Sequence, residues 1–94
     1  MKTVKLTVKV KNALGLHARP ASALTKLLQH SKSTVTISYR DKTADARSII
    51  SMLMLAIARN SEIILTVEGE DADETAKRLA RAFENQFGEL EQEF

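Results

Sequence analysis

Residues 3–24 have the sequence TVKLTVKVKNALGLHARPASAL, in which one hydrophobic pattern gives way to another. Over residues 3–10, apolar and polar residues alternate strictly, and this alternation predicts a strand with one buried face. From Leu16 onward, apolar residues recur at helical spacing through Ala21, Leu24 and Leu28, which predicts an amphipathic helix. The stretch therefore predicts a strand, a turn and a helix in succession.

The alternating pattern returns later in the chain. Residues 34–39 and 62–68 both alternate, which predicts two more strands. Residues 42–46 follow the pair Arg40-Asp41 and are expected to form the short second arm of a hairpin. Strands with one apolar and one polar face form a sheet that carries helices on one side and meets water on the other.

Two further helices are expected. One begins near Ser48, whose hydroxyl can cap a helix N-terminus, and ends near Arg59 and Asn60, because Asn tolerates the left-handed conformation that ends many helices. The other is marked by apolar residues at helical spacing, namely Ala76, Leu79, Ala80, Phe83, Phe87 and Leu90. A solvated tail is expected at Glu89, Glu91 and Glu93. The predicted order is β-α-β-β-α-β-α, and the predicted fold class is a two-layer α+β sandwich.

The composition is that of one ordinary globular domain, which we expect to comprise residues 1–94. The chain contains no cysteine, which excludes disulfides and thiolate metal sites, and no residue spacing typical of a metal site is present. No apolar run is long enough to span a bilayer, and the first residues lack the apolar core of a signal peptide. We therefore expect a cytoplasmic protein without membrane insertion, metal or cofactor.

The formal net charge of +2 hides an asymmetry along the chain. Residues 1–60 contain 11 Lys or Arg and 2 Asp or Glu, whereas residues 61–94 contain 3 and 10. A basic segment attracts nucleic acids, acidic proteins and phosphorylated ligands alike. The basic side chains are scattered singly and only 3 Phe and 1 Tyr are present, so nucleic-acid binding is not expected.

The segment Gly15-Leu16-His17-Ala18-Arg19-Pro20-Ala21 contains the candidate functional residue. His17 is expected at the N-terminus of the first helix, where unpaired backbone amides and the helix dipole attract an anion. Pro20 is tolerated in a first helical turn, and the Arg19 guanidinium can bind the same anion. A neutral imidazole is nucleophilic, so His17 could accept a phosphoryl group and pass it on. The alternative is an ordinary surface histidine, although a histidinium beside a positive helix end is unfavourable.

The run from Leu14 to Ala21 resembles the active-site signature of the HPr family, the histidine phosphocarriers of the sugar phosphotransferase system. Further segments resemble the family in the same order, namely Lys42-Thr43, Arg47-Ser48-Ile49, Ala58-Arg59 and Val67-Glu68-Gly69. The resemblance implies an open-faced sandwich, in which an antiparallel four-stranded sheet carries three helices on one face. It also implies that His17 accepts phosphate through Nδ1 from Enzyme I and passes it to an EIIA protein, with Arg19 as the phosphate partner. Such a protein is a stoichiometric carrier rather than an enzyme, and we expect a monomer because a shuttle must alternate between partners.

The resemblance implies two further roles. Ser48 stands where HPr proteins carry a regulatory serine, which implies an HPr kinase/phosphorylase as a partner; the alternative is that Ser48 only caps a helix. The docking face for Enzyme I and EIIA would be formed by Ile49, Ile50 and Leu53, with Lys26 and Arg47 on its rim. The alternative is that these apolar residues belong to the core. A basic surface would attract partners that are acidic around their own phosphohistidine.

The chain departs from the family pattern at several turns. Glycines of many HPr proteins are replaced at Ser51, Ala56 and Asn60. The usual Asn-Gly hairpin is replaced by Arg40-Asp41. The stretch Leu53-Met54-Leu55 is similar to NPr, the carrier of the nitrogen-related phosphotransferase system. Two alternatives therefore stay open, an NPr-type carrier and an HPr-like regulatory module that binds partners without relaying phosphate.

Overall fold

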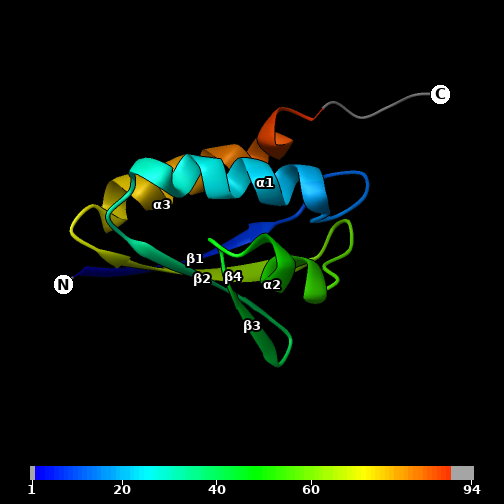
Figure 1. The fold of residues 1–94 in the computed structure, drawn as a ribbon, viewed down its shortest axis with the longest axis horizontal. Helices are drawn as coiled ribbons and strands as arrows, with labels where there is room; N and C mark the ends of the chain where they lie inside the picture. Colours follow the sequence, from blue (N-terminus) through cyan, green and yellow to red (C-terminus); the bar gives the residue numbers. More distant parts are fainter. Residues whose placement is uncertain (1, 90–94) are drawn as a thin grey trace.

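The computed structural model describes residues 2–89 (Figure 1). The chain forms, in order, β1 (Lys2–Lys9), α1 (Ala18–Leu27), the 3₁₀ turn η1 (Leu28–His30), β2 (Thr34–Tyr39), β3 (Lys42–Asp45), α2 (Ile49–Met54), β4 (Glu62–Gly69), α3 (Ala72–Glu84) and the 3₁₀ turn η2 (Gln86–Gly88). The predicted order β-α-β-β-α-β-α is confirmed. Within residues 2–89, no helix is long and apolar enough to cross a membrane.

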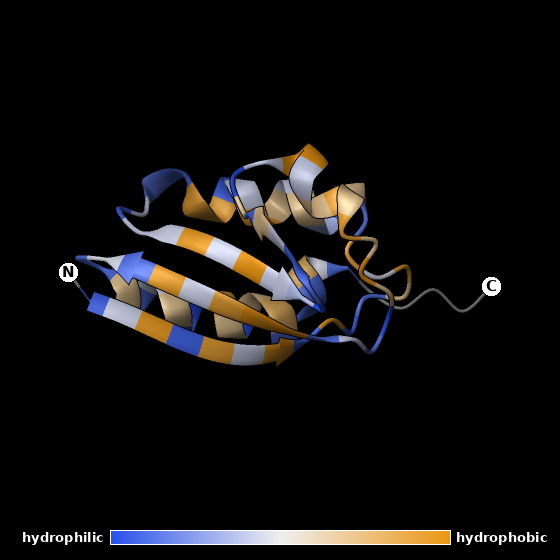
Figure 2. Ribbon diagram, turned by 90° about the horizontal axis from the view of Figure 1, so that it is seen from below, coloured by the Kyte–Doolittle hydropathy of each residue, from blue (hydrophilic) through white to orange (hydrophobic). Residues whose placement is uncertain are grey.

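The four strands form one antiparallel sheet in the order β1-β4-β2-β3. Val67 on β4 pairs with Val4 on β1 and with Val35 on β2. The apolar residues of neighbouring strands therefore lie side by side on the same face of the sheet. Figure 2 shows the stripes of apolar and polar residues that result along the strands. The sheet therefore has one apolar and one polar face, as the alternation predicts.

The helices cover the apolar face of the sheet (Figure 1). Both layers contribute fully buried side chains to the core, including Leu24, Leu28, Ile37, Leu65, Leu79 and Phe83. On β1, the inward residues Val4, Leu6 and Val8 are only partly buried, because this edge strand has a neighbour on one side alone. The predicted two-layer open-faced sandwich is confirmed.

Asp71, the N-cap residue of α3, links this helix to the segment that precedes β2. Its carboxylate accepts hydrogen bonds from the Ser33 hydroxyl at 2.5 Å and from the Lys32 backbone N–H at 2.9 Å. These hydrogen bonds stabilise the ionised form of Asp71 and hold its pKa below its ordinary value. The hydrogen bond from Ser33 has the largest effect on this pKa. The hydrogen bonds of the ionised Asp71 carboxylate therefore attach the start of α3 to the segment before β2.

The second helix is shorter than predicted. It ends at Met54 with Leu55 as its C-cap, and not near Arg59 and Asn60. Ala56 has a φ of 53°, a left-handed conformation that takes the chain out of the helix and lets Leu55 and Ile57 turn into the core. Asn60 does adopt the predicted left-handed conformation, with a φ of 69°, but in the turn before β4, where its N–H donates to the Val10 carbonyl at 2.7 Å.

The last helix also ends earlier than its apolar pattern predicts. α3 stops at Glu84, and Phe87 lies in η2 with a φ of 53°, although its ring still packs edge-to-face on Phe83 with centroids 4.8 Å apart. Ala80 is exposed, so its assignment to the apolar face was wrong. Leu90 lies outside the described residues. At the β2–β3 hairpin, Arg40 takes the left-handed conformation that the turn requires, with a φ of 57°.

Candidate functional site

The turn between β1 and α1 is shaped by Gly15. Its φ is 70°, and a Cβ atom at this position would lie 2.2 Å from the carbonyl oxygen of Ile57. The neighbouring Leu16 N–H donates to the same carbonyl at 3.0 Å, and the Gly15 N–H donates to the Asn12 carbonyl at 2.9 Å. The turn is therefore packed directly on the backbone that follows α2, and only glycine fits there.

This turn places His17 at the N-cap of α1. His17 has an extended backbone with φ −91° and ψ −171°, and its carbonyl accepts the first helical hydrogen bond from the Ala21 N–H at 3.0 Å. The Ala18 and Arg19 amides have no acceptor within the helix, and Pro20 has no amide hydrogen. No acidic residue occupies the first turn of α1. The imidazole therefore stands beside a positive helix end, as the sequence predicts.

The carboxylate of Glu89 reaches this site from the C-terminal part of the chain. Its Oε1 lies 3.1 Å from Nε2 of His17, and its Oε2 lies 4.0 Å from Nε of Arg19. The Glu89 side chain is only 17% exposed, whereas that of His17 is 30% exposed and that of Arg19 is 80% exposed. The expectation that Glu89 belongs to a solvated tail was wrong. Glu91 and Glu93 lie outside the described residues.

Asn12 holds this carboxylate in place. The Asn12 side chain is fully buried, and its Nδ2 donates to Oε1 of Glu89 at 2.7 Å and to the Gln86 carbonyl at 2.9 Å. Sequence reasoning missed both Asn12 and Glu89. The two residues are 77 positions apart, and η2 brings them together by packing against α1 (Figure 1).

The sequence model of the family described as "PTS HPr component phosphorylation site" matches residues 4–85. This chain belongs to the HPr family. It is 36% identical to phosphocarrier protein HPr of Chlamydia trachomatis over 81 residues, which cover 86% of this chain and 74% of that protein. The crystal structure of HPr-C-His from Thermoanaerobacter tengcongensis has a TM-score of 0.87 and 32% identity, and the match covers 97% of this chain and 100% of that one. A crystal structure of an HPr dimer from the same organism has a TM-score of 0.72 and 32% identity, and covers 89% and 97% of the two chains. The predicted family is confirmed.

The apolar residues expected to form the HPr docking face divide between surface and core. Ile50 is 72% exposed and Leu53 is 39% exposed, whereas Ile49 is partly buried and packs against the core. Three other large apolar side chains are also exposed, Leu14 at 75%, Met54 at 73% and, on β4, Ile64 at 46%. Exposed apolar residues therefore occur both in the turn before His17 and on α2.

The two cations expected on the rim of this face differ in their contacts. Lys26 is exposed on the last turn of α1. Arg47 donates through Nη1 to the Ser33 carbonyl at 2.8 Å, and through Nη2 to the Leu28 and Ser31 carbonyls at 2.9 and 3.0 Å. The Arg47 guanidinium thus binds the carbonyls of η1 and the chain just beyond it, which is a structural role that the sequence did not reveal.

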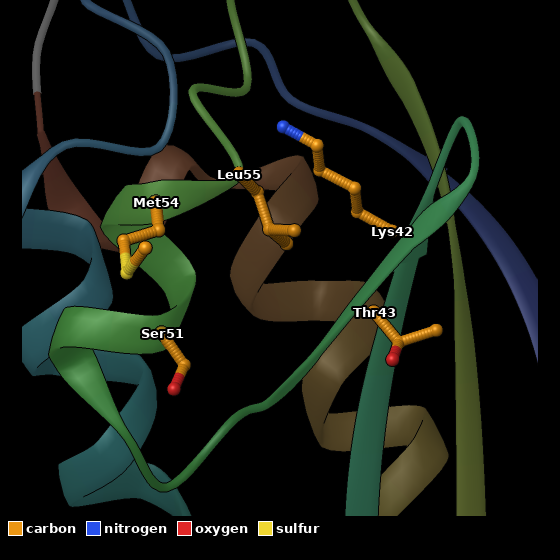
Figure 3. A pocket seen from close by; sticks show the side chains of 5 residues that line it. All are labelled: Lys42, Thr43, Ser51, Met54 and Leu55. Atoms are coloured by element: carbon orange, nitrogen blue, oxygen red, sulfur yellow. The ribbon is translucent and has the colours of Figure 1, made fainter.

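Ser48 is the N-cap of α2, and the predicted cap is confirmed. Its Oγ accepts a hydrogen bond from the Ser51 N–H at 3.2 Å and donates to Ser51 Oγ at 2.9 Å. Ser51 also lines a hollow of about 390 Å³ between α2 and β3, together with Lys42, Thr43, Met54 and Leu55 (Figure 3). Ser48 is partly exposed, and Ile50, two residues further on, is 72% exposed.

Proposed function

We propose that this HPr-family chain is a phosphocarrier of the phosphotransferase system, and that His17 carries the phosphoryl group. The observation that supports this role is the position of its partly exposed imidazole at the N-terminus of α1. The donor is phosphorylated Enzyme I and the acceptor is an EIIA protein, as the family resemblance implies. The chain is consumed and regenerated stoichiometrically, and the partners supply the catalytic groups.

The chemistry of the transfer requires little from the chain itself. The lone pair of Nδ1 attacks the phosphorus of the donor phosphohistidine, a new N–P bond forms, and the donor nitrogen keeps the electron pair of the bond that breaks. The phosphoryl oxygens can then accept hydrogen bonds from the Ala18 and Arg19 amides at the helix N-terminus. The Arg19 guanidinium, at 80% exposure, is free to turn from Glu89 to the phosphate.

The exposed surface of α1 and α2 suits acidic partners with an apolar patch. Ile50, Leu53 and Lys26 are exposed, and residues 1–60 contain 11 basic and 2 acidic side chains. A complementary charge raises the association rate, while the exposed apolar residues supply contact area. We include Ile49 and Arg47 at the margin of this docking face.

The assay for the carrier role is phosphoryl transfer from labelled phosphoenolpyruvate through Enzyme I. Label that is acid-labile and base-stable is expected on the wild-type chain and on His30→Ala, but not on His17→Ala. His30 is the matched control because it is the other histidine of the chain and is exposed. Label that persists in His17→Ala, or that never appears on the wild type with Enzyme I of either branch, would contradict the proposal.

The pathway branch and the oligomeric state need separate measurements. The stretch Leu53-Met54-Leu55 favours a nitrogen-type partner as the second candidate. Faster transfer from the phosphorylated chain to a nitrogen-type EIIA than to sugar-type EIIA proteins would assign it to that branch. We expect the carrier to be monomeric and cytoplasmic. The molar mass measured by size-exclusion chromatography with light scattering tests whether it is a monomer.

We further propose that phosphorylation of Ser48 regulates docking. A phosphate there would replace the hydrogen bond that Ser48 Oγ donates to Ser51 and would add negative charge beside Ile49 and Ile50. Acidic partners would then be repelled from this surface. An HPr kinase/phosphorylase with ATP is expected to form an acid-stable phosphoester on the wild type and on Ser51→Ala, but not on Ser48→Ala. Acid-stable label on Ser48→Ala would assign the modification to another residue.

A further inference from the structure

The His17–Glu89–Asn12 contact has a chemical consequence for the imidazole. Oε1 of Glu89 lies 3.1 Å from Nε2 of His17, and the fully buried Asn12 amide donates to the same oxygen at 2.7 Å. Asn12 is itself held by the Gln86 carbonyl at 2.9 Å. Two hydrogen bonds therefore meet at one oxygen of the carboxylate, one from a buried amide and the other from the imidazole.

A carboxylate oxygen can only accept a hydrogen bond, so the ring nitrogen that faces it must carry the hydrogen. In a neutral imidazole, the other nitrogen then has the lone pair. Within residues 2–89, no hydrogen bond reaches Nδ1 of His17. We propose that Glu89 is a positioning residue for phosphotransfer: it holds the proton of His17 on Nε2, and so directs the lone pair of Nδ1 to the incoming phosphorus. This inference rests on the proposed role of His17 as phosphoacceptor.

The same contact affects the product of the transfer. When the lone pair of Nδ1 forms the N–P bond, Nε2 keeps its hydrogen and the ring becomes positively charged. The Glu89 carboxylate stabilises that charge, in the way that a buried aspartate stabilises the imidazolium of a catalytic triad. When the phosphoryl group leaves, the electron pair of the N–P bond returns to Nδ1 and the ring is neutral again. Glu89 thus acts in both directions of the relay.

Arg19 does not compete strongly for this carboxylate. Its Nε lies 4.0 Å from Oε2, and its side chain is 80% exposed, so the ion pair is weak and screened by water. Oε1, in contrast, is shared by Asn12 and His17 at hydrogen-bonding distance. The two carboxylate oxygens therefore have separate roles, with Oε1 orienting the imidazole and Oε2 facing the exposed guanidinium of Arg19.

Four full-length proteins test the proposal: wild type, Glu89→Ala, Glu89→Gln and the control Glu84→Gln. Glu84 is the matched control because it belongs to the same C-terminal part of the chain, but its exposed side chain binds Lys11 Nζ at 2.8 Å, away from His17. With ¹⁵N-labelled histidine, NMR reports which ring nitrogen carries the hydrogen and how fast that hydrogen exchanges with water. The rate of phosphorylation by Enzyme I is measured on the same samples.

We expect wild type and Glu84→Gln to show a slowly exchanging hydrogen on Nε2 of His17. In Glu89→Ala this protection is lost, and phosphorylation slows by about tenfold, the lower end of the effect of removing a group that orients a metal-binding histidine. Glu89→Gln is expected to recover the Nε2 signature and part of the rate, because its amide oxygen still accepts. The exchange rate of the His30 ring hydrogens should not change in any variant.

Two results would overturn the inference. One is a neutral wild-type ring with the hydrogen on Nδ1. The other is a Glu89→Ala protein that is phosphorylated at the wild-type rate and retains the protected Nε2 hydrogen. If no protein accepts label while the NMR signature depends on Glu89, the contact is correct and the carrier function fails. The two failures are therefore distinguishable.

Discussion

Replacement of Gly15 by alanine should displace the turn that positions His17. The left-handed backbone at Gly15 costs an alanine roughly 1–2 kcal/mol. The new Cβ would lie 2.2 Å from the Ile57 carbonyl oxygen, and because both groups are held by backbone, no side-chain rotation relieves the contact. The turn must move away, which breaks the hydrogen bond from the Leu16 N–H to this carbonyl and costs about 1 kcal/mol more.

Together these effects predict a loss of about 2–3 kcal/mol in the free energy of unfolding. For a domain of this size, that corresponds to a fall in Tm of roughly 10–20 °C. Urea denaturation followed by far-UV circular dichroism measures the first quantity, and a thermal scan measures the second. The rate of His17 phosphorylation should fall as well, at temperatures where Gly15→Ala is still folded, because the imidazole moves with the turn.

Gly88→Ala separates the steric effect from the backbone effect. Gly88 also has a left-handed backbone, with a φ of 81°, but a Cβ atom there would meet nothing within 4 Å. We therefore expect Gly88→Ala to lose only the backbone contribution and to remain more stable than Gly15→Ala. Equal stability of the two variants, or a Gly15→Ala protein as stable as wild type, would refute the steric reasoning.

Three other changes test separate features of the structure. Ser48→Ala removes the hydrogen bond accepted from the Ser51 N–H and should lower the unfolding free energy by about 1 kcal/mol in urea denaturation; an unchanged midpoint would mean that the cap contributes nothing. The pKa of Asp71 is lowered in the folded state, chiefly by the Ser33 hydroxyl, so its contribution is present above its ordinary pKa and is lost as the pH falls through the folded value. Stability measured against pH should accordingly fall less steeply on the acid side for Asp71→Asn than for wild type, and parallel curves would argue against this linkage. Ile50→Glu changes an exposed residue, so we expect a stability within about 0.5 kcal/mol of wild type but roughly tenfold slower transfer from Enzyme I, and equal transfer rates would remove Ile50 from the docking face.

Local sequence signals predicted most of the fold. Alternation identified the strands because a half-buried strand repeats every two residues, and this period depends only on neighbouring positions. Ser48 was predicted as a cap from its residue type and its position before an apolar helix, and the hydrogen bond that confirms this spans only three residues. The placement of His17 at a helix N-terminus was likewise local, because Gly15 permits a sharp turn before it and Pro20 restricts the backbone after it.

The errors occur where distant parts of the chain compete with the local pattern. Residues 55–58 are apolar enough to continue α2, but the chain leaves the helix at Ala56 so that Leu55 and Ile57 can enter the core and the Ile57 carbonyl can accept the Leu16 N–H. Ile49 and Ile50 look equivalent in sequence, yet one packs against the core and the other is 72% exposed. The orientation of a short helix on a sheet is decided by packing, which hydrophobicity alone does not encode.

The sequence by itself determined the strand and helix order, the position of His17 at a helix start and membership of the HPr family, because each of these is expressed in contiguous residues. Only the tertiary structure decided the environment of the imidazole. Glu89 bonds the imidazole and Asn12 bonds Glu89, although the two residues come from opposite ends of the chain and their types and spacing indicate no relation between them. Their contact exists because η2 packs against α1 and brings a carboxylate to a helix N-terminus, where a negative charge is stabilised.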